Sequence, residues 1–144
     1  MSTLPSYTDI SVEFQNHVAL VEICRPPHNF FDHSLIQQLA DSMERLDKIV
    51  DCRSIVLTSQ GRSFCAGAQF TADSEGKAQY QLGSPAPLYV EAVRLFKAKK
   101  PIVAAINGAA VGGGLGLSLV ADFRVGSPES RFVANLGFSS GSIV

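Results

Sequence analysis

The chain has 144 residues, 46% of them hydrophobic and 17% charged, and a formal net charge of −1. This length and composition suit one globular domain, and the small, mixed charge gives no footprint of a nucleic-acid or membrane-surface partner. No apolar run approaches the ~20 residues of a membrane span, and the first five residues do not resemble a signal peptide. Three cysteines without metal-ligand spacing predict reduced thiols, a cytoplasmic location and no metal site: Cys24, Cys52 and Cys65.

Two strands and a long amphipathic helix are predicted for the first third of the chain. Apolar and polar residues alternate over residues 10–15, and a second strand is expected over 17–24, with a turn at Gln15 and Asn16. A helix is expected over 33–50, with Asp32 as its N-cap. Its apolar stripe consists of Leu35, Leu39, Met43, Leu46 and Val50.

The rest of the chain repeats this order of elements. Further strands are expected over residues 53–59, 101–106 and 123–125, and further helices over 88–98 and 113–120. The first of these helices is expected to face inward mainly with Val90, Val93, Leu95 and Phe96. Residues 71–87 are polar and rich in glycine and proline, which predicts a surface insertion. The recurring strand, strand, helix order fits an α/β fold of stacked ββα turns.

Two loops of small residues follow buried-looking strands. Residues 63–68 follow the apolar run 55–57, and residues 107–116 follow the strand predicted over 101–106. Glycine and alanine allow a ligand to approach the backbone closely, and a strand-to-helix turn leaves amide N–H groups free to bind negative charge. If both loops converge on one point, they make a two-donor oxyanion hole.

These loops belong to motifs that carry a family resemblance. The motifs are Phe-Cys-Ala-Gly-Ala at 64–68, Lys-Pro-Ile-Val-Ala-Ala-Ile-Asn-Gly at 100–108, and three glycines at 112–114 with Asp122 downstream. The opening Arg25-Pro26-Pro27 and Asn29 fit the same pattern. Together they resemble the crotonase superfamily, the enoyl-CoA hydratase/isomerase family. The resemblance implies the crotonase-like spiral of ββα units, an acyl-CoA thioester as substrate, no cofactor besides the coenzyme A of the substrate, and a homo-oligomer, a trimer or hexamer.

The resemblance also implies the site residues. The backbone amides of Ala68 and Gly113 would hold the thioester oxygen of an enolate and are the predicted catalytic groups, with the helix N-terminus at Gly113 adding favourable potential. Predicted substrate-binding residues are Arg25, near the coenzyme A phosphates, and the loop residues Ala66, Gly67, Gly112, Gly114 and Gly116.

The acid–base residues of the family's hydratases have no counterpart here. Gly116 occupies the position of one glutamate, and Leu136 or Gly137 that of the other. Because neither position can move a proton, two-glutamate hydration is disfavoured. Other carboxylates and a phenol near the first loop remain candidates: Asp73, Glu75, Tyr80 and Glu91.

Three functions stay open at this point. The leading one is an enoyl-CoA hydratase/isomerase family enzyme that stabilises an enolate. The second is a non-catalytic acyl-CoA-binding or subunit-interaction module, favoured by the missing glutamates. The third, a serine hydrolase, rests on Ser139 in a Gly-x-Ser-x-Gly match, but a triad needs a downstream histidine, and all three histidines lie upstream.

The tail departs from the family pattern. Residues 1–144 are interpreted as a crotonase-like core domain that lacks the family's C-terminal helical part. Without those helices, apolar surface should be exposed at Val103, Leu115, Leu117 and Leu119. Such patches favour association, so the isolated chain is expected to be oligomeric, domain-swapped or poorly soluble, and to bind acyl-CoA weakly if at all.

Overall fold

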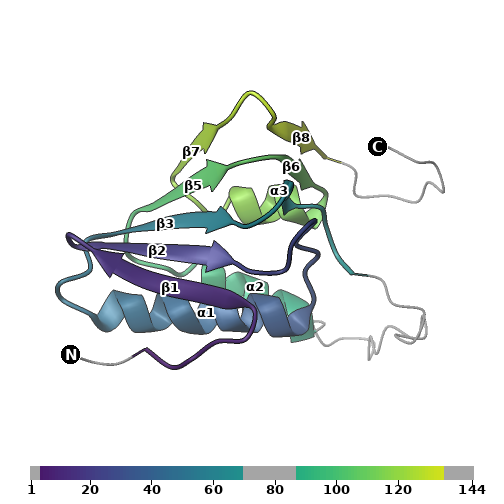
Figure 1. Cartoon of the computed structure of the whole chain (residues 1–144). Coiled ribbons are helices and arrows are strands. Elements are labelled where there is room, and N and C mark those ends of the chain that lie inside the picture. Colours follow the sequence, from purple (N-terminus) through teal and green to yellow (C-terminus); the bar gives the residue numbers. More distant parts are fainter. Residues whose placement is uncertain (1–3, 70–86, 135–144) are drawn as a thin grey trace.

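The computed structural model describes residues 4–69 and 87–134, and their strands form two sheets (Figure 1). The larger sheet contains, in spatial order, β1 (Ile10–Gln15), β2 (Val18–Ile23), β3 (Ser54–Ser59), β5 (Ile102–Ile106) and β7 (Phe123–Gly126). The smaller sheet contains β4 (Ser63–Cys65), β6 (Ala109–Val111) and β8 (Arg131–Val133). Only the β1–β2 hairpin is antiparallel among these strand pairs.

The helices follow the strands in a repeating order. They are α1 (His33–Lys48), α2 (Pro87–Leu95) and α3 (Gly113–Ser118). The pairs β3–β4, β5–β6 and β7–β8 each place one strand in the larger sheet and the next in the smaller sheet. A helix follows the first two of these pairs, so the predicted spiral of stacked ββα turns is confirmed.

The core lies between the larger sheet and the helices α1 and α2, which run along one face of it in Figure 1. Alternate residues of β2, β3 and β5 are buried, as expected for strands with one face against helices. The buried side chains of these strands include Val21, Ile23, Ile55, Leu57, Ile102 and Ile106. They pack with the inner face of α1 in one cluster.

The N-terminus of α1 agrees with the sequence, and its C-terminus does not. Asp32 caps the helix, since its Oδ1 accepts the Leu35 amide at 3.0 Å. The helix ends at Lys48 because Ile49 has extended backbone angles, φ −84° and ψ 112°. Val50 is therefore on the turn into β3 and is 90% exposed, so its predicted place in the core stripe is wrong.

The orientation of α2 also differs from the expectation. Leu95 is buried, but Val90, Val93 and Phe96 are 45%, 54% and 63% exposed. Leu95 shares a face with Leu88 and Ala92, and these three pack against the core. Because the helix carries apolar residues on both faces, its sequence did not distinguish the inner face from the outer one.

The smaller sheet was not predicted, because β4, β6 and β8 have three residues each, too few to show an alternating pattern. Several boundaries also move, and α2 ends at Leu95 instead of residue 98. The first turn is at Asn16 and His17, whose φ angles are 49° and 69°, so β2 starts at Val18 rather than at residue 17. The helix α3 ends at Ser118 instead of residue 120.

The expected apolar exposure is only partly present. Leu119 is 54% exposed, and Val103 and Leu115 are half-buried. Leu117 is only 4% exposed, so its predicted exposure is wrong, because it faces the core from α3. Within the two described ranges, no helix is both long and apolar enough to cross a membrane.

Candidate functional site

The first predicted loop continues β4 and pairs with the segment before α1. The Ala66 amide donates to His28 O at 2.9 Å, and the Phe31 amide donates to Gly67 O at 2.9 Å. Phe31 and Ala68 form a parallel bridge. Because successive amides of an extended segment point in opposite directions, the Ala68 N–H points away from the Phe31 segment.

Gly67 has the backbone conformation that its residue type permits. Its φ is 109°, and a Cβ there would lie 3.3 Å from Val111 O of β6. A side chain would therefore be strained by the torsion and crowded by the neighbouring strand. The small residue at this position lets the first loop approach β6.

The second loop runs from β6 into α3. The N-cap Gly112 has φ 54° and ψ −116°, and its amide donates to Val133 O at 2.8 Å. The first helical bond of this turn is donated by Gly116 to Gly112 O at 3.1 Å. Gly113 is the first residue of the helix, and its amide is one of those that a helix leaves without an internal partner.

Close backbone contacts hold the two loops together. In the parallel pair β4–β6, Ser63 pairs with Ala109 and Cys65 with Ala110. A Cβ on Gly114 would lie 2.0 Å from Cys65 O, and a Cβ on Gly113 would lie 2.4 Å from Phe31 Cζ. The ring of Phe31 thus contacts the second loop, while its backbone pairs with the first.

The structure therefore brings six predicted site residues into one region around Phe31 and β6: Ala66, Gly67, Ala68, Gly112, Gly113 and Gly114. In residues 4–69 and 87–134, neither the Ala68 amide nor the Gly113 amide has a hydrogen-bond acceptor. Gly116 lies within α3, and a Cβ on it would meet nothing within 4 Å.

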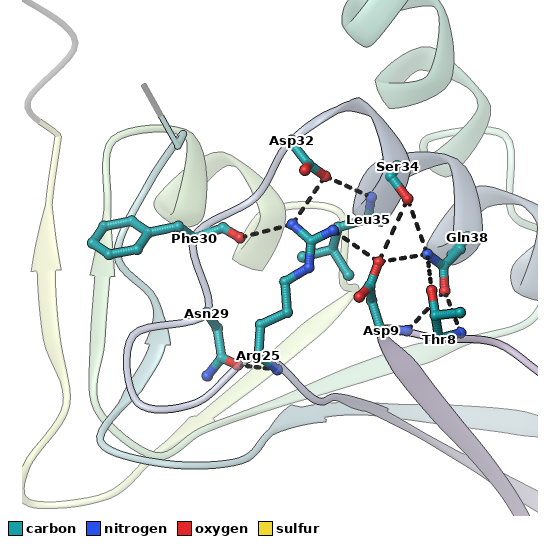
Figure 2. Close-up of polar contacts among 9 residues, drawn as sticks. All are labelled: Thr8, Asp9, Arg25, Asn29, Phe30, Asp32, Ser34, Leu35 and Gln38. Carbon is teal, nitrogen blue, oxygen red and sulfur yellow. Dashed lines mark hydrogen bonds and ion pairs between the residues drawn. The ribbon is translucent and has the colours of Figure 1, made fainter. Parts of the chain in front are cut away.

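Arg25 lies in a polar cluster at the start of α1 (Figure 2). Its guanidinium is 2.8 Å from Asp9 Oδ2 and 2.9 Å from Asp32 Oδ1, and it also donates to Phe30 O at 3.3 Å. Gln38 donates to the same Asp9 oxygen at 2.6 Å. Arg25 thus pairs with two carboxylates and joins the residue before β1 to the N-cap of α1. Its contact with a coenzyme A phosphate stays a prediction.

This cluster makes stability depend on pH. The hydrogen bond from Arg25 holds the pKa of Asp9 below its ordinary value, despite an opposing effect of burial. A lowered folded-state pKa contributes stability above the unfolded value of about 3.9, and that contribution is lost as the pH falls through the folded-state pKa.

We expect Arg25→Gln to lower the free energy of unfolding by about 1 kcal/mol at pH 7. The difference from wild type should begin to shrink below about pH 4, where the unfolded chain binds the Asp9 proton, and should disappear once the pH passes the lower pKa of folded Asp9. Urea unfolding at pH 7, 5 and 3 measures this difference in the free energy of unfolding. A difference that is constant over this range would show that the ion pair with Asp9 is not its source.

Other reactive side chains in the described part have structural partners. Burial raises the pKa of the Cys65 thiol to about 11, so it is a neutral, buried side chain at pH 7. Glu91 pairs with Arg94, which also binds Asp41 at 2.5 Å and Glu44 at 2.8 Å, and so belongs to the α1–α2 contact. The other acid–base candidates, Asp73, Glu75 and Tyr80, lie outside the described residues, as do Ser139 and the second glutamate position.

Three residues near the loops were missed as functional candidates. Phe31 was not considered, and Asn29 and Asn107 were used only as motif members. Asn29 is fully buried with a φ of 51°, and its side chain bonds the backbone near β4. A short polar side chain beside a proline turn was the available signal. In the part of the chain that the structure covers, no group of three or more potential metal ligands is present.

Comparison with solved structures defines the class of the fold. A Legionella pneumophila protein assigned as an enoyl-CoA hydratase/isomerase (crotonase) matches with a TM-score of 0.76 and 30% identity, over 88% of this chain and 51% of that one. An enoyl-CoA hydratase/isomerase from Pseudoalteromonas atlantica matches with a TM-score of 0.75 and 28% identity, over 88% and 50%. The chain has the crotonase fold.

Residues 13–143 match the family model of enoyl-CoA hydratase/isomerase, and the chain belongs to this family. It is 33% identical to the probable enoyl-CoA hydratase EchA14 of Mycobacterium tuberculosis, over 91% of this chain and 52% of the relative. It is 36% identical to 4-chlorobenzoyl coenzyme A dehalogenase-1 of Arthrobacter sp, over 86% and 47%. The chain thus spans about half the length of the curated relatives it matches.

Proposed function

We propose that this chain forms the thioester-binding part of an acyl-CoA-processing enzyme of the lyase or isomerase class. The observation that carries the proposal is the meeting of two loops around Phe31, each with an amide that has no acceptor in the described ranges. The names of two relatives support the ligand class, since both contain coenzyme A: the chlorobenzoyl dehalogenase and (E)-benzylidenesuccinyl-CoA hydratase of Thauera aromatica.

In this proposal the amides of Ala68 and Gly113 donate to the thioester oxygen. When a proton leaves the carbon beside the carbonyl, the negative charge of the enolate develops on that oxygen. Fixed donors aimed at a developing charge stabilise the transition state more than the ground state, and one such donor contributes about 3 kcal/mol. The loops supply these donors from the backbone, so the small side chains serve to let the thioester approach.

The proton-transfer group is a separate question. Gly116 cannot serve as an acid or base, although the space beside its Cα is open to at least 4 Å. We therefore disfavour two-glutamate hydration as the reaction. The same observation favours the second candidate function, a non-catalytic acyl-CoA-binding or subunit-interaction module.

The carbonyl contact can be tested by changing the ligand. Hexanoyl-CoA should bind about tenfold more tightly than S-hexyl-CoA, which lacks only the carbonyl oxygen, because two amide hydrogen bonds are lost. Calorimetry measures both affinities, and NMR shows whether the carbonyl moves the amide signals of Ala68 and Gly113. The amide of Gly61, in an exposed corner, is the control. Equal affinities for the two ligands would contradict the proposal.

Enolate formation distinguishes the two candidate functions, because an enzyme would form the enolate and a non-catalytic binding module would not. In D2O, an enzyme of this kind should exchange the protons beside the carbonyl of bound hexanoyl-CoA, which NMR follows directly. Gly113→Ala should slow this exchange about 10²-fold, because its Cβ must displace the Phe31 ring. Leu119→Ala, at the exposed C-cap of the same helix and outside the proposed site, is the control. Binding without any exchange by the wild-type chain would favour the module.

A further inference from the structure

The corner between β3 and β4 carries backbone carbonyls that accept hydrogen bonds from side chains of other segments. The chain leaves the larger sheet after Ser59 and enters the smaller one at Ser63. Two asparagine side chains from other turns of the spiral donate to four carbonyls of this corner, those of Ser59, Gln60, Gly61 and Ser63. Ser59 and Ser63 are buried residues, and a buried carbonyl without a partner is costly, so this part of the corner depends on these two side chains.

Asn29 reaches the corner from the segment before α1. Its Nδ2 donates to Gln60 O at 2.6 Å and to Ser63 O at 2.8 Å. Its Oδ1 accepts the Arg25 amide at 3.0 Å. The side chain is fully buried and uses both amide hydrogens, so its position is defined from three directions.

Asn107 reaches the same corner from the end of β5. Its Nδ2 donates to Gly61 O at 2.9 Å and lies 3.3 Å from Ser59 O. Its Oδ1 lies 3.0 Å from Ser59 Oγ, whose single hydrogen can also serve Ser63 O at 3.2 Å. Asn107 is followed directly by Gly108 and β6, so one residue bonds the first loop's corner and begins the second loop.

Backbone contacts strengthen the same connection. A Cβ on Gly108 would lie 2.0 Å from Arg62 O, so the two corners touch through their main chains. The Ser63 amide donates to Pro27 O at 3.1 Å, next to the Asn29 segment. Three successive turns of the spiral are therefore joined at one point, immediately before β4 and β6.

We propose that Asn29 and Asn107 form a corner clamp that sets the position of the Ala68 amide relative to the Gly113 amide. β4 has only three residues before the loop at Ala66, so a displaced corner carries the loop with it. The clamp side chains bond the corner and not the Ala68 or Gly113 amides, so they are positioning residues. Their role in thioester binding rests on the proposed function, whereas their effect on the loop does not.

The test replaces each amide by a carboxylate of nearly the same shape. In Asn29→Asp and Asn107→Asp, a carboxylate oxygen faces backbone carbonyls that previously accepted hydrogen bonds. Hydrogen exchange should accelerate about tenfold or more at the amides of Ser63 and Ala66, relative to the remote Asp122 amide, which donates to Ile102 O. Asn16→Asp, at an exposed turn with φ 49°, is the matched control and should leave the exchange rates of the Ser63 and Ala66 amides unchanged.

A second measurement reports on the ligand site. The preference for hexanoyl-CoA over S-hexyl-CoA should fall from about tenfold to about twofold in either clamp variant and stay unchanged in Asn16→Asp. If both Asp variants fail to fold, Ser59→Ala removes one bond of the clamp and should accelerate exchange at Ser63 about fivefold.

The outcomes are distinguishable. Uniformly faster exchange over the whole chain, together with an unchanged ligand preference, would overturn the corner clamp and leave a purely structural role. A wild-type chain without any carbonyl preference would contradict the proposed function alone. In that case the local exchange at Ser63 and Ala66 still decides whether the clamp exists.

Discussion

Replacing Gly114 by alanine is expected to lower the free energy of unfolding by about 3 kcal/mol or more. The new Cβ would lie 2.0 Å from Cys65 O and 2.7 Å from Cys65 C. These are backbone atoms of β4, which pairs with β6 and cannot turn aside as a flexible side chain would. Relief would require the first loop and α3 to move apart, so the structure loses the contact between the two predicted donor loops.

Gly116→Ala is the matched control for this prediction, since it makes the same change two residues later in α3. Nothing lies within 4 Å of its Cβ position, and alanine favours helix over glycine by about 1 kcal/mol. The control should therefore be neutral or stabilising. Urea unfolding followed by circular dichroism gives both values, and similar effects of the two substitutions would contradict the packing of α3 on β4.

Phe64→Ala is expected to lower the free energy of unfolding by about 3–5 kcal/mol. Among the described residues, Phe64 is the largest fully buried side chain, and it lies in the middle of β4, between the corner and the Ala66 loop. Truncation leaves a cavity that neighbouring strands, fixed by their hydrogen bonds, fill only partly. The loop at Ala66 should also become less stable, because β4 has no other large side chain that packs into the core.

The control is Phe14→Ala on β1, where the side chain is 42% exposed. Less apolar area is removed from the interior, so the cost should be about 1 kcal/mol. Unfolding in urea compares the two variants, and hydrogen exchange at the Ala66 amide shows whether the loop loosens only in Phe64→Ala. A smaller cost at Phe64 than at Phe14 would mean that β4 is not anchored by its side chain.

The described structure also changes how the charged residues are interpreted. Arg25 was selected for its place before a proline turn, but its guanidinium is held between Asp9 and Asp32. Glu91 was selected for its nearness to the first loop, but it pairs with Arg94 between α1 and α2. Charge and position along the chain suggested ligand contacts, whereas both side chains are engaged by other charged groups of the protein, Glu91 by Arg94 of its own helix.

Local periodicity determined much of this protein. Alternating burial in β2, β3 and β5, the Asp32 cap of α1 and the two small-residue loops all follow from neighbours in the chain. The order of motifs also indicated the family and the spiral fold, because stacked turns repeat the same strand, strand, helix pattern. These features were predicted correctly because they depend on residues that are adjacent in the sequence.

Tertiary contacts decided the rest. The three-residue strands β4, β6 and β8 are too short to show a period and exist only because they pair with one another. The inner face of α2 depends on which side meets α1, and the roles of Asn29 and Asn107 depend on a corner more than thirty residues away from each. These features arise from hydrogen bonds and packing between distant segments, whose energies no local window of the sequence contains.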